Sequence, residues 1–109
     1  MSDLADQPAP ASPAELSQSE RASYVEQLDE TVWTIKDDHL VGTLEFEDFE
    51  GALTFASTVG AIADDLWHHP ELRVTWGELK VDLQTHDIGG LSTLDFIMAA
   101  RIERAYREA

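Results

Sequence analysis

The 109-residue sequence predicts an α+β domain with the element order αββαββα, in which a four-stranded antiparallel sheet carries its helices on one face. Three observations lead to this prediction. Two stretches alternate apolar and polar residues as strands do, and each contains a turn that would make it a hairpin. Three other stretches repeat apolar residues at helical spacing. A serine or an aspartate precedes each of these three, as expected of a helix N-cap.

The N-terminal residues and the first helix differ sharply in composition. Residues 1–14 are rich in Pro, Ala, Ser and Asp without an apolar period, so we expect a flexible acidic tail ahead of a single domain at 15–109. Ser17 and Glu20 have the spacing of a capping box, and Leu16 has the position of a hydrophobic staple. The helix that follows should turn three apolar residues inward: Tyr24, Val25 and Leu28.

The first hairpin is predicted over 32–46, with a polar turn at 36–38. Asp48 is a suitable N-cap for the long helix that follows. Pro70 should end that helix close to His68, because the residue before a proline avoids helical backbone angles. The apolar residues of this helix recur at helical spacing: Phe55, Val59, Ile62 and Leu66.

The second hairpin is predicted over 72–86, with its turn near Gly77, and a loop should follow at 87–90. Ser92 and Asp95 then have the spacing of another helix cap. The last helix should bury a stripe of Leu94, Ile97, Met98, Ile102 and Tyr106. By default we assign five aromatic residues to the core, namely Trp33, Trp76, Phe46, Phe49 and Phe55, and we expect His39 to be solvated in the first hairpin.

The charge and the cysteine content exclude several kinds of chemistry. The chain has 22 Asp and Glu against 7 Lys and Arg, a net charge of −15, which disfavours binding to nucleic acid or to an anionic membrane surface. Cysteine is absent, so disulfides, thiolate nucleophiles and cysteine-bound metals are excluded. No stretch resembles a transmembrane helix or a secretory signal, so we expect a cytoplasmic protein. The acidity points to a salt-loving host, with an ordinary acidic bacterial protein as the alternative.

Three of the four histidines fall in one window, as His68, His69 and His86. The first two follow a predicted helix C-terminus, where the helix dipole favours imidazolium. Asp64 and Asp65 precede them by four residues each and could reach them across one helical turn. Because imidazoles titrate near neutral pH, the three histidines could act as general acids and bases without a cofactor.

Two other interpretations stay open from the residue types alone. Three histidines are the ligand set of one class of catalytic zinc site, although the sequence has no H-E-x-x-H or H-x-H pairing. Alternatively, His68 and His69 only cap a helix while His86 ends a strand.

Four spaced motifs resemble those of the pterin-4a-carbinolamine dehydratases. They are D-x(3)-H-H-P at 64–70, the aromatic Trp76, T-H-D at 85–87 and G-L-S-x-x-D at 90–95. Weaker agreement extends the match over about 16–106, and the family has the same element order. The resemblance implies a lyase that removes water from the 4a-hydroxytetrahydropterin made by aromatic amino acid hydroxylases. The product is the quinonoid dihydropterin, and neither a metal nor an organic cofactor is expected.

The resemblance also implies roles for individual residues. His68 and His86 would be the acid/base pair, and His69 would position the pterin. The pterin pocket would be lined by Trp67, Thr85 and Asp87.

Two acidic residues would support the site, and one aromatic departs from the family pattern. Asp64 stands where many members have the longer Glu, and Trp67 stands where small or acidic residues are common. Asp95 matches an acidic position of the family's site, while its capping spacing is sufficient explanation by itself.

Two rival functions remain at this stage. One is a non-catalytic binding, assembly or coactivator protein on the same fold, and the other is a dehydratase-like enzyme of another pterin pathway, such as a molybdopterin-related one. Relatives form dimers and tetramers, and an open sheet has edges to cover, so we expect a homodimer or homotetramer.

Overall fold

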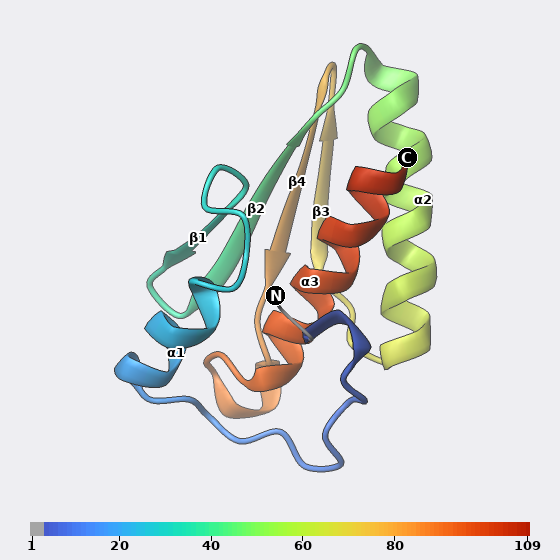
Figure 1. Cartoon of the computed structure of the whole chain (residues 1–109). Coiled ribbons are helices and arrows are strands. Elements are labelled where there is room, and N and C mark those ends of the chain that lie inside the picture. Colours follow the sequence, from blue (N-terminus) through green and yellow to red (C-terminus); the bar gives the residue numbers. More distant parts are fainter. Residues whose placement is uncertain (1–3) are drawn as a thin grey trace.

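The computed structural model describes residues 4–109 as a four-stranded antiparallel sheet with its helices on one face (Figure 1). The strands lie in the order β1-β2-β4-β3. This arrangement confirms the predicted α+β class and element order, to which two short 3-10 helices, η1 and η2, are added. In chain order the elements are η1 (Leu4–Asp6), α1 (Gln18–Val25), β1 (Trp33–Lys36), β2 (His39–Glu45), α2 (Phe49–Leu66), β3 (Glu71–Thr75), β4 (Glu78–Leu83), η2 (His86–Ile88) and α3 (Thr93–Glu108).

The two central strands supply the sheet side of the core. In their register, Leu40 pairs with Leu83 and Leu44 pairs with Leu79, so that alternate residues of β2 and β4 turn toward the helices and are buried. Gly42 lies on the same side beneath the ring of Trp33, and a Cβ added there would come within 2.5 Å of that ring. Position 42 therefore requires a glycine, because any side chain there would clash with the Trp33 ring that packs on β2.

Three local signals in the sequence placed the helix starts correctly. The Ser17 N–H donates to the Glu20 carboxylate and the Glu20 N–H donates to the Ser17 hydroxyl, which completes the predicted capping box of α1. Asp48 caps α2 by accepting the N–H of Gly51 at 2.8 Å. α3 begins directly after Ser92 and lies across the sheet between α1 and α2, where most of its side chains are buried.

The N-terminal residues differ from the expected loose tail. Residues 4–7, here called the N-terminal strap, lie across α3 (Figure 1). Leu4 is fully buried, and Arg101 donates hydrogen bonds to the carbonyls of Ala5 and Gln7. A single leucine without a periodic neighbour gives no signal in the sequence, which is why this packing was not expected. Residues 1–3 lie outside the described residues, and flexibility in the rest of 1–14 stays a prediction.

The default assignment of aromatic residues to the core is correct in part. Trp33 and Phe55 are buried, and Phe46 packs against Phe55 with ring centroids 5.5 Å apart. Trp76 and Phe49, in contrast, are exposed, so their assignment was wrong. Trp76 lies in the turn between β3 and β4, and Phe49 is the first residue of α2.

Candidate active site

The end of α2 is set by a residue in a left-handed backbone conformation. Trp67 has φ 51° and ψ 47°, and its N–H donates back to the last turn of the helix. A non-glycine residue in this conformation costs roughly 1–2 kcal/mol. The helix therefore stops close to His68, as predicted, and the chain changes direction before Pro70.

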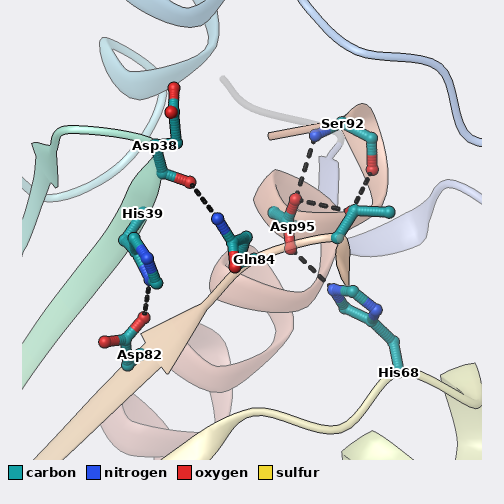
Figure 2. Close-up of polar contacts among 8 residues, drawn as sticks. Asp38, His39, His68, Asp82, Gln84, Ser92 and Asp95 are labelled. Carbon is teal, nitrogen blue, oxygen red and sulfur yellow. Dashed lines mark hydrogen bonds and ion pairs between the residues drawn. The ribbon is translucent and has the colours of Figure 1, made fainter. Parts of the chain in front are cut away.

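His68 pairs with a carboxylate that comes from a different helix. Its Nε2 lies 2.6 Å from Oδ1 of Asp95, in the first turn of α3 (Figure 2). The His68 side chain is 10% exposed and that of Asp95 is 0% exposed. This pair is thus shielded from solvent, where hydrogen bonds to a charged group are strongest.

The second oxygen of Asp95 binds the loop between β4 and α3. Oδ2 accepts the Ser92 N–H at 2.9 Å and the Thr85 hydroxyl at 2.8 Å. The Thr85 and Ser92 hydroxyl oxygens lie 2.7 Å apart, and both residues are buried. We call His68, Asp95, Thr85 and Ser92 the His68 network. Asp95 therefore both caps α3 and orients His68, whereas the sequence analysis gave capping as sufficient explanation.

His69 lies on the exposed side of the same turn. Its Nε2 is 2.9 Å from Oδ1 of Asp64, and its ring stands edge-on to that of Trp67, with centroids 5.3 Å apart. The expected pairs, Asp64 with His68 and Asp65 with His69, were therefore wrong. Both assumed a continuous helix, and the left-handed residue at position 67 ends the four-residue spacing.

His86 follows Thr85 directly and begins η2, where it is exposed together with Asp87. The Thr85 N–H donates to the Gly90 carbonyl at 2.9 Å, and this bridge closes the loop that carries His86. The His68 network therefore ties two sequence-predicted histidines to one support: His68 through Asp95, and the backbone of His86 through Thr85. His69 is outside the network.

A fourth histidine has a partner that the sequence analysis did not assign to it. His39 was expected to be only solvated, but its Nδ1 lies 2.6 Å from Oδ1 of Asp82 (Figure 2). The two residues come from neighbouring strands on the face of the sheet away from the helices, and both remain partly exposed.

The hydrogen bond between the hydroxyls of Thr85 and Ser92 was also not predicted from the sequence. The signal for them was the capping spacing of Ser92 and Asp95.

Within residues 4–109, no group of three or more histidine or acidic side chains is arranged so that it could hold a metal ion. In the same range, no helix has the length and apolar character needed to span a bilayer.

Comparisons with known proteins identify the family to which the chain is similar. The family model described as "Pterin 4 alpha carbinolamine dehydratase" matches residues 14–105. A protein of Alkaliphilus metalliredigens named "Putative pterin-4-alpha-carbinolamine dehydratase" is 38% identical over 93 residues, which cover 85% of this chain and 84% of that protein. A protein of Haloarcula marismortui with the same name is 43% identical over 70 residues, covering 64% of this chain and 76% of its own.

A solved structure is similar over the same region. The crystal structure of a "transcriptional coactivator/pterin dehydratase" from Brucella melitensis superposes with a TM-score of 0.77 at 29% identity. The superposition covers 85% of this chain and 98% of that chain.

Proposed function

Because the chain belongs to the pterin 4 alpha carbinolamine dehydratase family, we propose that it dehydrates 4a-hydroxytetrahydropterin to the quinonoid dihydropterin by histidine acid/base catalysis. The observation that carries this proposal is the His68 network, in which a buried carboxylate orients one histidine and supports the loop that bears another. The physiological role would be to recycle the pterin of aromatic amino acid hydroxylases.

The reaction needs two proton transfers and no electron acceptor. The C4a–O bond breaks and the hydroxyl group leaves as water, while N5 loses its proton and its electrons form the C4a=N5 double bond. One imidazole protonates the departing oxygen, and the other takes the N5 proton. We assign these two tasks to His68 and His86.

The two histidines suit these tasks for different reasons. Asp95 fixes the orientation of the His68 ring, as the carboxylate of a catalytic triad does. His86 is exposed in a short 3-10 helix, so its ring is free to approach a substrate from solvent. In this proposal one of the two histidines acts on the departing C4a oxygen and the other on the N5 proton, with His68 held rigidly and His86 open to solvent.

The exposed turn after α2 supplies the proposed pterin contacts. Trp67 is 83% exposed and stands edge-on to His69, which gives the turn an aromatic wall beside a ring that can donate hydrogen bonds. Asp64 would hold His69 for this task. Asp87, exposed next to His86, completes the proposed set.

Thr85 is assigned a supporting role within this proposal. Its hydroxyl binds Asp95 and Ser92, its N–H binds Gly90, and its carbonyl accepts the N–H of Ile88. Thr85 is buried, and each of its polar groups is already engaged within the chain. We therefore propose that Thr85 supports the pocket from behind and does not bind the pterin itself.

The test is the dehydration of enzymatically generated 4a-hydroxytetrahydropterin, followed by absorbance in molar salt. The uncatalysed reaction is slow but measurable and serves as the baseline. We expect wild type to accelerate it and His86→Ala to lose about 10²–10⁴-fold of that acceleration. No acceleration by a well-folded wild type would contradict the proposal.

A second candidate function is favoured by one observation. The Brucella melitensis neighbour is named as a transcriptional coactivator as well as a pterin dehydratase. A binding role on this fold is therefore the alternative if catalysis is absent. A third candidate, dehydration of a pterin from another pathway, would be supported if other 4a-hydroxypterins reacted faster than 4a-hydroxytetrahydrobiopterin.

We also propose that the protein assembles as a homodimer or homotetramer. Exposed apolar side chains support this proposal, because Phe49 and Leu53 lie on α2 and Leu72 lies on the edge strand β3. A net charge of −15 repels a second copy in dilute buffer, so association should strengthen with salt. Sedimentation that shows tighter assembly at low salt would contradict this.

A further inference from the structure

The hydroxyl groups of Thr85 and Ser92 form a directed chain that ends on Asp95. The Thr85 Oγ1 lies 2.8 Å from Asp95 Oδ2 and 2.7 Å from Ser92 Oγ. An ionised carboxylate accepts hydrogen bonds and donates none, so Thr85 must give its only hydroxyl proton to Asp95. The Ser92 hydroxyl must then donate to Thr85. The two hydroxyls therefore both point toward the carboxylate.

These donors determine which oxygen of Asp95 is available to His68. Oδ2 already accepts two hydrogen bonds, from the Thr85 hydroxyl and from the Ser92 N–H. Oδ1 is the oxygen that faces His68, at 2.6 Å from Nε2. An acceptor at this distance requires that Nε2 carries a hydrogen, because two acceptors would repel each other.

The position of that hydrogen selects the nitrogen that can react. With Nε2–H held by Asp95, a neutral His68 ring has its lone pair on Nδ1, and a charged ring has its exchangeable proton on Nδ1. In Figure 2 the other ring nitrogen lies on the side away from Asp95. Nδ1 is thus the His68 atom that exchanges a proton with the substrate, whether His68 acts as the acid or as the base.

We infer that Thr85 and Ser92 are positioning residues that fix the tautomer of His68 through Asp95, so that Nδ1 moves the proton in the reaction. The inference deepens the proposed function and rests on it for the catalytic part. The tautomer itself does not depend on the substrate. It can be measured whether or not the protein is a dehydratase.

The chain contains its own reference for the opposite tautomer. His39 presents Nδ1 to Asp82 at the same distance of 2.6 Å, which leaves its Nε2 free. His39 should therefore carry its hydrogen on Nδ1 where His68 carries it on Nε2. Both rings are observed in one spectrum of the same sample.

The first experiment is nitrogen NMR of the full chain labelled with ¹⁵N-histidine, at a pH where the rings are neutral. The spectrum distinguishes a protonated ring nitrogen from a bare one, and single His→Gln variants assign the signals. We expect Nε2–H for His68 in wild type and a mixture of tautomers in Thr85→Val and Ser92→Ala. Thr85→Ser, which keeps a hydroxyl, should retain Nε2–H.

The second experiment measures kcat and KM of the same variants. Displacement of a catalytic group by an ångström can cost about 10²-fold, so we expect kcat of Thr85→Val to fall by about 10- to 100-fold with KM little changed. Thr85→Ser should recover most of kcat. Ser17→Ala is the matched control, because Ser17 caps α1 as Ser92 precedes α3 but lies outside the His68 network.

Three outcomes would overturn the inference. One is Nδ1–H for His68 in wild type, and another is an unchanged tautomer and kcat in Thr85→Val and Ser92→Ala. The third is an equal loss of kcat in Thr85→Ser and Thr85→Val, because that would indicate a purely structural role. An inactive wild type whose His68 still loses Nε2–H in Thr85→Val would contradict the proposed function but support the tautomer assignment.

Discussion

Two His–Asp pairs of equal length occupy opposite sides of the sheet. His68 and Asp95 approach to 2.6 Å on the helix side, and His39 and Asp82 approach to 2.6 Å on the other face. The first pair has side chains 10% and 0% exposed, and the second has 40% and 39% exposed. The distance between two atoms therefore does not distinguish a candidate site from a surface contact.

The surroundings of the two carboxylates make the difference. Asp95 receives additional donors from Ser92 and Thr85, and these residues connect it to the loop of another histidine. For Asp82 the described hydrogen bond is the one to His39, while the nearby half-buried Gln84 donates to the carbonyl of Asp38 (Figure 2). Burial and connected donors, more than the pair itself, give a histidine a fixed orientation.

The largest expected difference is in catalysis. His68→Gln should lower the rate of pterin dehydration by about 10²–10⁴-fold, because it removes a positioned acid/base group. His39→Gln should leave the rate unchanged. The measurement is the absorbance assay with both variants at matched concentration, and a comparable loss in both would contradict the distinction between the two pairs.

The second difference is in stability. Asp95→Asn leaves a buried histidine and buried donors without their carboxylate, so we expect the free energy of unfolding to fall by about 3 kcal/mol or more. Asp82→Asn breaks a partly exposed pair and should cost less than about 1 kcal/mol. Urea unfolding in molar salt gives both values. Equal losses would show that the two environments do not differ as described.

The third prediction concerns the left-handed residue beside His69. Trp67→Gly should raise the free energy of unfolding by up to about 1 kcal/mol, because glycine adopts positive φ without strain. It should also raise KM without lowering kcat, because the proposed aromatic wall is lost. Asp37 also has positive φ, and Asp37→Gly is the control that should gain stability with KM unchanged. An unchanged KM in Trp67→Gly would remove Trp67 from the proposed pterin contacts.

The smallest effect extends the comparison to a carboxylate without a histidine. The hydroxyl of Thr31, and then its N–H, hold the pKa of Asp29 below its ordinary value. A lowered folded-state pKa adds stability above the ordinary aspartate value of about 4, and this contribution is lost as the pH falls through the folded-state pKa.

Asp29→Asn should therefore cost about 0.5 kcal/mol at neutral pH, and the difference from wild type should shrink in acid. Thr31→Val should cost a similar amount with the same pH dependence. The measurement is urea unfolding at several pH values between neutral and acid. A difference that grows as the pH falls would have the wrong sign.

The elements of the fold were predictable because their signals are local. The capping residues Ser17 and Asp48 lie within three residues of the groups they bind, and Gly77 marks the turn of the second hairpin. For the same reason, the sequence did not predict the pair formed by His68 and Asp95. Residues 68 and 95 are separated by 27 positions, and only the tertiary fold brings the end of α2 to the start of α3.

The candidate site was predictable as a set of residues but not as a geometry. The spacing of the motifs identified His68, His69 and His86, while the pairing of Asp64 was wrong because the sequence does not reveal the left-handed conformation of Trp67. A bulky residue in that conformation is uncommon, so no propensity favours it.

The N-terminal strap has a consequence for the order in which the chain can fold during synthesis. The hydrogen bond from Arg101 to Ala5 joins residues 96 positions apart, and Leu4 is buried in the same region. A ribosome makes the strap before α3 and must translate almost all of the domain before α3 emerges to meet it. Contacts between such distant residues slow folding, because a long loop must close before they form. The strap is therefore expected to dock after the sheet has formed, as one of the last steps of folding.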